Sequence, residues 1–168
     1  DRPSPEYFAE LQRVSKHQII WGANHLADLF DASGPAWIVW NKEAGCSFAD
    51  CELAYSSFNH AARLYTYRWS GMLQGSHGDK RKNEHRIHPS QKPVKLYDWI
   101  LKTFSAPDQR ILDTHLGSGS SAIAAHYFGC DFVGCEIDSD YFKATQARFA
   151  EETRQIDMLN ISPTEEQK

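Results

Sequence analysis

The segment from 111 to 138 constrains this chain more than any other, because its pattern predicts a strand, a glycine-rich turn, a helix and a second strand in that order. The apolar start ends at Asp113, and Gly117 and Gly119 then allow the backbone to turn tightly under a ligand. An Ala-rich helix is expected over about 120–128, and a second apolar strand follows it. Such a unit is one half of a nucleotide-type cofactor site in an α/β fold.

The chemistry of this turn depends on two carboxylates. Glu136 follows Gly117 by 19 positions, the spacing at which an acidic residue meets ribose hydroxyls. Gly117, Gly119 and Ala122 also satisfy the dinucleotide pattern G-x-G-x-x-G/A, which brings a pyrophosphate to a helix N-terminus. Asp113 argues against that ligand, because a carboxylate beside a phosphate costs on the order of 4 kcal/mol per close pair at an effective dielectric of about 20. S-adenosylmethionine carries an ammonium and a sulfonium instead, and its ribose would still bind Glu136. A dinucleotide site and a purely structural turn are the alternatives.

Length and composition indicate one α/β domain with its own core. The chain has 168 residues, of which 41% are hydrophobic, and this leaves little room for a second domain. No apolar run approaches the roughly 18 residues of a membrane span, so we expect no membrane association. The four cysteines form two pairs whose spacing fits neither a usual zinc site nor a disulfide framework, and we expect reduced core thiols at Cys46, Cys51, Cys130 and Cys135.

Charge is unevenly distributed along the chain. The net charge is −4, yet the segment 76–97 contains six basic and two acidic residues, so the remainder carries −8. One interpretation is an anion-facing surface on an acidic body, and the other is a solvated loop with scattered lysines. The polar residues 71–89 show no hydrophobic periodicity and predict a mobile basic loop that leaves the core.

Local patterns predict the other elements. The expected elements are a helix over 5–16 capped by Ser4, buried strands at 19–21 and 36–40, a β-hairpin from 52–58 and 63–69, and a helix over 93–104. In the hairpin, Tyr65, Tyr67 and Trp69 would share one face, which we interpret as core, with stacking on nucleic-acid bases as the alternative. Past Phe149 the charges predict a frayed end, with residues 155–168 as a flexible acidic tail.

The start of the helix predicted over 93–104 is a candidate anion receptor. Backbone N–H groups at a helix start are free donors at the positive end of the helix dipole. Together with Lys92, they would receive a carboxylate such as that of the methionine part of S-adenosylmethionine. Ser90 is available as the N-cap of this helix.

Three motifs together resemble a known enzyme family. HPSQKP occupies 88–93, DTHLGSGSS occupies 113–121 and VGCEIDSDYF occupies 133–142. With them the sequence resembles the permuted, β-class DNA amino-methyltransferases, most specifically over 88–149 and more weakly back to IIWGANHL at 19–26. The resemblance implies a Rossmann-like methyltransferase sheet with helices on both faces. It also implies transfer of a methyl group from S-adenosylmethionine to the exocyclic amine of adenine or cytosine.

The same resemblance implies roles for individual residues. Ser90 and Lys92 would lie near the methionine carboxylate, and Glu136 would hold the ribose. The glycine-rich motif would surround the methionine part of the cofactor with Asp113, Gly117, Ser118 and Gly119.

Two departures from the family pattern bear on the activity. Thr114-His115 stands where the family commonly has Pro-Phe, and this form is similar to phage and prophage-like relatives that act on adenine. We therefore expect methylation of adenine N6, with cytosine N4 as the alternative. His115 would shape the cofactor pocket or pack within the turn. The family's catalytic tetrapeptide, Asp/Asn/Ser-Pro-Pro-Tyr/Phe, does not occur in the 168 residues, and we expect it upstream of Asp1.

The function expected from these features is site-specific methylation of double-stranded DNA, of the restriction-modification type, with the target base flipped out of the duplex. The residues expected to contact DNA are Lys80, Arg81, Lys82 and Arg86. We expect a cytoplasmic protein encoded by a bacterium or phage, with no need for a metal, and leave a homodimer open. A cofactor-binding or DNA-binding module without chemistry and an oxidoreductase are the rival interpretations.

Overall fold

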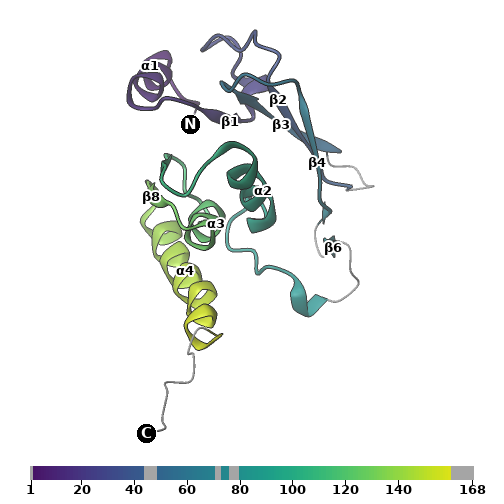
Figure 1. Ribbon diagram of the computed structural model, residues 1–168, viewed down its shortest axis with the longest axis vertical. Helices are drawn as coiled ribbons and strands as arrows, with labels where there is room; N and C mark the ends of the chain where they lie inside the picture. Colours follow the sequence, from purple (N-terminus) through teal and green to yellow (C-terminus); the bar gives the residue numbers. More distant parts are fainter. Residues whose placement is uncertain (1, 44–48, 71–72, 76–79, 160–168) are drawn as a thin grey trace, which may run out of the picture. The chain divides into compact units, whose positions relative to one another are not determined.

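A computed structural model describes residues 2–43, 49–70, 73–75 and 80–159 of the chain (Figure 1). The elements group into two compact units, residues 1–83 and 84–168. Both combine helices with strands, so the predicted α/β class is confirmed. Across the described residues, the structure contains no helix long and apolar enough to cross a membrane.

The first unit begins with helix α1, Pro5–Val14, as predicted. Ser4 has extended dihedral angles, and its side chain accepts a hydrogen bond from the Tyr7 N–H, which caps the helix. Phe8 is buried on the inner face of α1 and stacks on Phe30 with ring centroids 4.8 Å apart. Burial of this aromatic pair attaches the helix to its unit.

A four-stranded sheet forms the body of the first unit, in the order β1-β3-β2-β4. Its strands are β1 (Ile19–Trp21), β2 (Trp37–Asn41), β3 (Cys51–Ser56) and β4 (Arg63–Thr66). Gly22 ends β1 with a φ of 70°, and the short 3-10 helix η1, Ala23–His25, follows. Ile38 and Trp40 are fully buried on one face of the sheet, as expected of the apolar run at 36–40.

The hairpin predicted from 52–58 and 63–69 is wrong. Strand β3 pairs antiparallel with β1 and β2, whereas β4 pairs parallel with β2 on the opposite side. The chain therefore crosses over β2 between 56 and 63, because strand pairing is decided by long-range packing that a local pattern does not contain. A small hairpin forms further along, from β5 (Trp69–Ser70) and β6 (Leu73–Gln74).

The aromatic face predicted for 63–69 is divided in the structure. Tyr65 and Tyr67 are partly buried and stack with ring centroids 6.3 Å apart, whereas Trp69 belongs to β5 and is buried. The polar stretch 71–89 includes a single turn of 3-10 helix, η2 (Lys80–Lys82), and the residues 71–72 and 76–79 of that prediction lie outside the described residues.

The second unit is built on a parallel strand pair. Strand β7, Arg110–Asp113, pairs with β8, Asp131–Gly134, and the connecting helix α3 spans Ser120–Phe128 as predicted. Gly129 ends α3 with a φ of 82°, the left-handed conformation that favours glycine at a helix C-terminus. Two buried alanines of α3 and the buried Leu101 form a core against which Ile111 and Phe132 pack.

Helix α2, Val94–Phe104, packs on α3 but is not capped by Ser90, contrary to prediction. Pro93 is the N-cap residue and its ring cannot accept a hydrogen bond. Instead the Val94 N–H donates to Glu84 Oε1 at 2.9 Å. The cap is thus supplied by a side chain ten positions upstream, which the local pattern did not reveal.

Helix α4 spans Ser139–Leu159, so the chain is helical for ten residues past Phe149, where a frayed end was predicted. Its start is fixed by Asp138, whose Oδ1 accepts hydrogen bonds from the Asp140 and Tyr141 N–H groups. Of the flexible acidic tail predicted over 155–168, residues 160–168 lie outside the described residues.

The described cysteines are free, as predicted, but they are not all core residues. Cys51 and Cys135 are exposed, and Cys130 is partly buried, with burial raising the pKa of its thiol. Cys46 lies outside the described residues.

Candidate cofactor site in the second unit

The glycine-rich turn, residues 114–119, joins the end of β7 to the start of α3 (Figure 1). Its backbone continues the strand pairing, because Cys135 N–H donates to the Asp113 carbonyl and Leu116 N–H donates to the Cys135 carbonyl. Gly117 and Gly119 both have left-handed φ angles, 53° and 73°. The turn is therefore tied to the carboxyl end of the parallel pair, where open α/β sheets bind ligands.

Asp113 closes the turn from its strand end. One carboxylate oxygen accepts the His115 N–H at 3.0 Å, and the other accepts the Ser121 hydroxyl at 2.5 Å. Both oxygens keep further lone pairs for a ligand. Asp113 thus fixes the turn and leaves a negative charge beside it.

Glu136 closes the same turn from the second strand. Its two carboxylate oxygens accept the Gly117 N–H at 2.8 Å and the Asp138 N–H at 3.0 Å. The Asp138 N–H contributes most to lowering the pKa of Glu136, with smaller contributions from the Gly117 and Ile137 N–H groups and from His88. Glu136 is therefore ionised near neutral pH and adds a second negative charge beside the turn.

Helix α4 closes the far side of the turn. A Cβ atom added at Gly119 would lie 2.5 Å from the Thr145 methyl group, closer than real Cβ contacts come. The Thr145 hydroxyl also donates a hydrogen bond to the Gly117 carbonyl. Gly119 is consequently required both by its φ and by the proximity of this helix.

The serine of the turn and the first serine of α3 are inside the protein. Ser118 and Ser120 are buried, and their hydroxyls are 3.1 Å apart. A ligand would therefore meet the backbone of Ser118, not its hydroxyl. His115 is exposed, with Nδ1 3.1 Å from the Thr114 hydroxyl.

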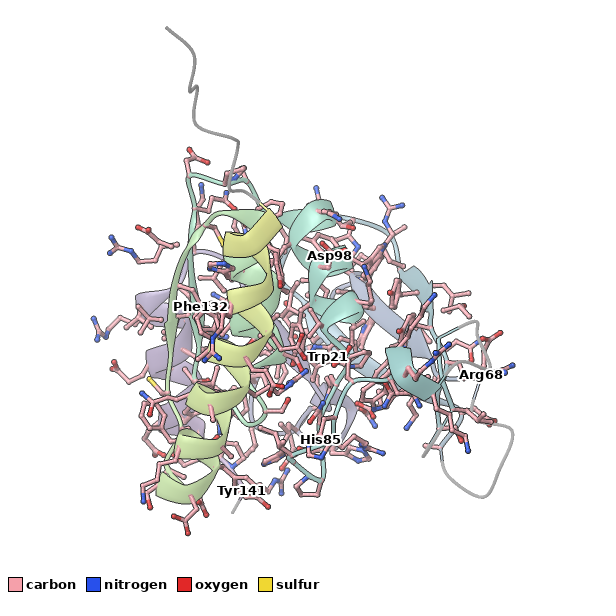
Figure 2. The ribbon with its side chains drawn as sticks, turned by 90° about the horizontal axis from the view of Figure 1, so that it is seen from below. Trp21, Arg68, His85, Asp98, Phe132 and Tyr141 are labelled. Carbon is pink, nitrogen blue, oxygen red and sulfur yellow. The ribbon has the colours of Figure 1, made fainter. Side chains whose placement is uncertain are left out.

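His88 connects the HPSQKP segment to the glycine-rich turn. Its ring lies edge-on to that of Tyr141, with centroids 4.4 Å apart. Tyr141 belongs to the first turn of α4 (Figure 2). A Cβ atom added at Gly117 would lie 3.7 Å from the His88 ring. Ser90 is exposed, and both its N–H and its hydroxyl lie within hydrogen-bond distance of His88 Nδ1. Ser90 is thus brought to the turn through His88.

Gln91 organises the approach to α2. It is buried, its side-chain oxygen accepts the Ile87 N–H at 2.9 Å, and its side-chain nitrogen donates to the His85 carbonyl at 3.0 Å. Lys92 is the next residue in the sequence and is partly buried, whereas Pro93 after it is buried. The Val94 N–H, expected as a free donor, is already bound to Glu84.

The basic residues predicted to contact DNA are exposed. Lys80, Arg81 and Lys82 form the 3-10 turn η2 of the first unit. Arg86 belongs to the second unit, where its guanidinium lies 3.5 Å from the Pro89 carbonyl. The predicted set is therefore divided between the two units.

Sequence reasoning missed the polar side chains that hold the turn from behind. Tyr141, Thr145 and Arg148 share one face of α4 by their spacing of four and three residues, and all contact the turn or His88. This polar stripe on a helix was the signal that could have found them. Among the described residues, no group of three or more His, Cys, Asp or Glu side chains could hold a metal ion.

Comparison with known proteins identifies relatives of this chain. YubD of Escherichia coli (strain K12) is 37% identical over 65 residues, which is 39% of this chain and 29% of YubD. The type II methyltransferase M1.MboII of Moraxella bovis is 37% identical over 62 residues, 37% of this chain and 23% of the relative. The alignments thus span less than a third of either relative.

Solved structures share the fold at low identity. M1.HpyAVI, solved as a complex with SAM, has a TM-score of 0.58 and 19% identity, over 79% of this chain and 73% of that one. The cytosine-N4-specific PvuII DNA methyltransferase has a TM-score of 0.50 and 16% identity, over 75% and 56% of the two chains. These likenesses confirm the methyltransferase fold predicted from the motifs.

The family model described as DNA methylase, for the N6 and N4 amino-methyltransferases, matches residues 59–147, more than half of the chain. The matched range contains the HPSQKP segment, both carboxylates and the glycine-rich turn. The chain belongs to the N6/N4 DNA methylase family.

Proposed function

We propose that this chain forms the cofactor-binding part of a permuted DNA amino-methyltransferase that uses S-adenosylmethionine. The observation that supports this most is the placement of Asp113 and Glu136 at the carboxyl ends of two neighbouring parallel strands, on either side of one glycine-rich turn. A ligand over the turn would meet Asp113 with its cationic part and Glu136 with its ribose. M1.HpyAVI, which shares the fold, was solved with the same cofactor bound.

The other turn and motif residues would complete the site. The backbone of Gly117, Ser118 and Gly119 would lie under the methionine part, and His115 would line the pocket. Ser90 and Lys92 would receive the methionine carboxylate. When bound, S-adenosylmethionine would supply an electrophilic methyl group, and the residues named here would bind and orient it.

Adenine N6 is the proposed target, with cytosine N4 as the second candidate. The order of the motifs, with HPSQKP before the glycine-rich turn, supports the permuted class. Thr114-His115 supports the phage-like adenine branch, whereas the shared fold with the PvuII enzyme extends to a cytosine-N4 methyltransferase. The target base would leave the duplex for the reaction, at a cost of a few kcal/mol.

DNA would be bound through the exposed basic residues. Lys80, Arg81 and Lys82 would contact phosphates, and Arg86 would contact a base edge. The tetrapeptide that accepts the amine hydrogens in the family does not occur in these 168 residues, so methyl transfer is proposed for the native reading frame that contains them. We place the protein in the cytoplasm with double-stranded DNA and leave a homodimer open.

The electrostatic part of the cofactor proposal is tested by Asp113→Asn. Asparagine can accept the His115 N–H and donate to the Ser121 hydroxyl, so it keeps both turn contacts and removes only the charge. We expect S-adenosylmethionine to bind roughly tenfold more weakly, which is about 1.4 kcal/mol, in isothermal calorimetry. Asp131→Asn, at an exposed strand start on β8, is the matched control and should leave affinity unchanged.

A parallel titration of the wild-type protein with NAD should give no saturable heat. Saturable NAD binding that survives Asp113→Asn would support the dinucleotide interpretation and overturn the proposed cofactor. For the reaction, the native reading frame should be expressed in cells without methylases, and its DNA hydrolysed to nucleosides for mass spectrometry. N6-methyladenine is the expected product, and N4-methylcytosine would correct the target. The absence of both methylated bases would favour a non-catalytic module.

A further inference from the structure

Arg148 is the most deeply buried charged side chain in contact with the glycine-rich turn. It lies in the middle of α4, and its side chain is only 5% exposed. Arginine is almost never buried to this degree unless its guanidinium is paired. The residue had no role in the predictions from sequence, so its contacts need an explanation.

The guanidinium connects three segments that are far apart in sequence. Its Nη1 donates to the Ser118 carbonyl at 2.8 Å and to the Ser120 hydroxyl at 2.9 Å. Its Nη2 donates to Glu84 Oε2 at 2.8 Å, while Glu84 Oε1 accepts the Val94 N–H. The Arg148 guanidinium thus joins α4 to the glycine-rich turn by hydrogen bonds. Through its ion pair with Glu84 it also joins α4 to the start of α2.

This arrangement is a poor way to gain stability. Burial raises the pKa of Glu84 against the lowering effect of Arg148, which reflects the desolvation of the carboxylate. The Arg148 Nε is buried with no hydrogen-bond partner among the described residues. Buried ion pairs can often be replaced by apolar side chains without loss of stability. The contacts are therefore better explained by the geometry that they impose.

The imposed geometry is the orientation of two successive peptide groups. Thr145 binds the Gly117 carbonyl and Arg148 binds the Ser118 carbonyl, so both carbonyls face α4. The peptide group between Gly117 and Ser118 is planar and trans, so its N–H points opposite to its carbonyl. The Ser118 N–H is therefore directed away from α4. Glu84 also balances the positive charge, which would otherwise repel a cationic ligand at the turn.

We propose that Arg148, paired with Glu84, is a positioning residue that holds the glycine-rich turn and the start of α2 in register for the methyl donor. This inference rests on the proposed function for the identity of the ligand. Arg148 acts through the turn and does not touch the ligand.

The experiment separates positioning from stability with a double variant of the full chain. Arg148→Met alone removes the guanidinium that pairs with the partly buried Glu84 carboxylate, so it should destabilise the protein. Glu84→Gln/Arg148→Met removes both charges and keeps an acceptor for the Val94 N–H, so its urea unfolding should return close to the wild-type value. Arg154→Met, at an exposed position of the same helix, is the matched control.

Two readouts then decide. Backbone amides at 117–121 of the unliganded double variant should exchange hydrogen about tenfold faster or more, because the carbonyl tether is lost, while β7 and β8 keep wild-type exchange. Affinity for S-adenosylmethionine should fall about tenfold, the effect expected for losing a charged hydrogen bond. Arg148→Lys should recover part of both losses, since one ammonium can reach only some of the acceptors.

The proposal would be overturned by a double variant that unfolds like the wild type and keeps the wild-type hydrogen exchange of amides 117–121. A double variant that keeps the wild-type affinity for S-adenosylmethionine would also overturn it. If the wild-type protein binds no S-adenosylmethionine, the proposed function fails. The exchange of the turn amides still tests the tether in that case, because this measurement needs no ligand.

Discussion

The glycine-rich turn and the basic set, Lys80, Arg81, Lys82 and Arg86, differ in how much of their structure is fixed before a ligand arrives. In the turn, both carboxylates accept backbone hydrogen bonds and two carbonyls bind side chains of α4. In the basic set, three residues form one exposed 3-10 turn of the first unit, and the fourth belongs to the second unit.

The difference corresponds to the ligands proposed for the two regions. A small cofactor is bound by groups at fixed positions, because any movement of those groups reduces its affinity. A phosphate backbone is a repeating line of charge, and long basic side chains can follow it without a fixed scaffold. Substitutions should therefore act through geometry in the turn and through charge in the basic set.

The largest effect is expected from Gly119→Ala. The alanine would have to adopt the left-handed φ of residue 119, and its Cβ would collide with the Thr145 methyl group. Together, backbone strain and overpacking should reduce the free energy of unfolding by about 2–4 kcal/mol in urea titration. Gly129→Ala, which has a φ of 82° but open space around its Cβ, should show the strain alone, about 1 kcal/mol.

A second change tests the source of that effect. Thr145→Ser removes only the colliding methyl group and keeps the hydroxyl that binds the Gly117 carbonyl. Gly119→Ala/Thr145→Ser should therefore recover to the level of Gly129→Ala. Failure to recover would mean that the turn does not approach α4 as closely as described.

An intermediate effect is expected from replacing Lys80, Arg81 and Lys82 together by Ala. Each lost phosphate contact should reduce the slope of log affinity against log salt by up to roughly 0.9, with folding unchanged. The matched control replaces three exposed basic residues that pair with acidic helix neighbours, Arg13, Lys102 and Lys143. An equal loss of slope in both triple variants would show a general charge effect and no DNA face at η2.

The smallest effect is expected on acidification. Hydrogen bonds from backbone N–H groups, that of Asp138 first, hold the pKa of Glu136 below its usual value of about 4.5. The ionised carboxylate therefore stabilises the folded protein above that value, and the contribution is lost as the pH falls through the lowered pKa. Glu136→Gln should flatten the dependence of unfolding free energy on pH below about 4.5. Glu151→Gln, which removes an exposed carboxylate of α4 outside the turn, is the matched control.

Features that depend on neighbouring residues were predictable from sequence. Helix α3 was predicted at its observed bounds because alanines favour a helix and Gly129 ends it. The placement of Asp113 and Glu136 at the turn followed from their spacing to the glycines. Ser4 and Pro5 likewise identified the start of α1.

Features that depend on distant residues were not predictable. The pairing of β4 with β2 instead of β3 is set by packing across the sheet. The cap of α2 comes from Glu84 and not from the nearby Ser90. Arg148 meets a partner 64 positions away, and the polar stripe that it shares with Tyr141 and Thr145 on α4 does not identify that partner.

The glycine at the end of β8 affects how the evolution of this site should be interpreted. A Cβ atom at Gly134 would lie 2.8 Å from a Leu116 methyl group and 2.9 Å from the Phe132 ring, although its φ is not left-handed. Among homologues, Gly134 is therefore expected to vary only together with Leu116 or Phe132. Gly119 is restricted by its backbone as well, and should remain glycine even where Thr145 changes. Invariance at 134 would thus record the packing between strand and turn, and would be no evidence of contact with a ligand.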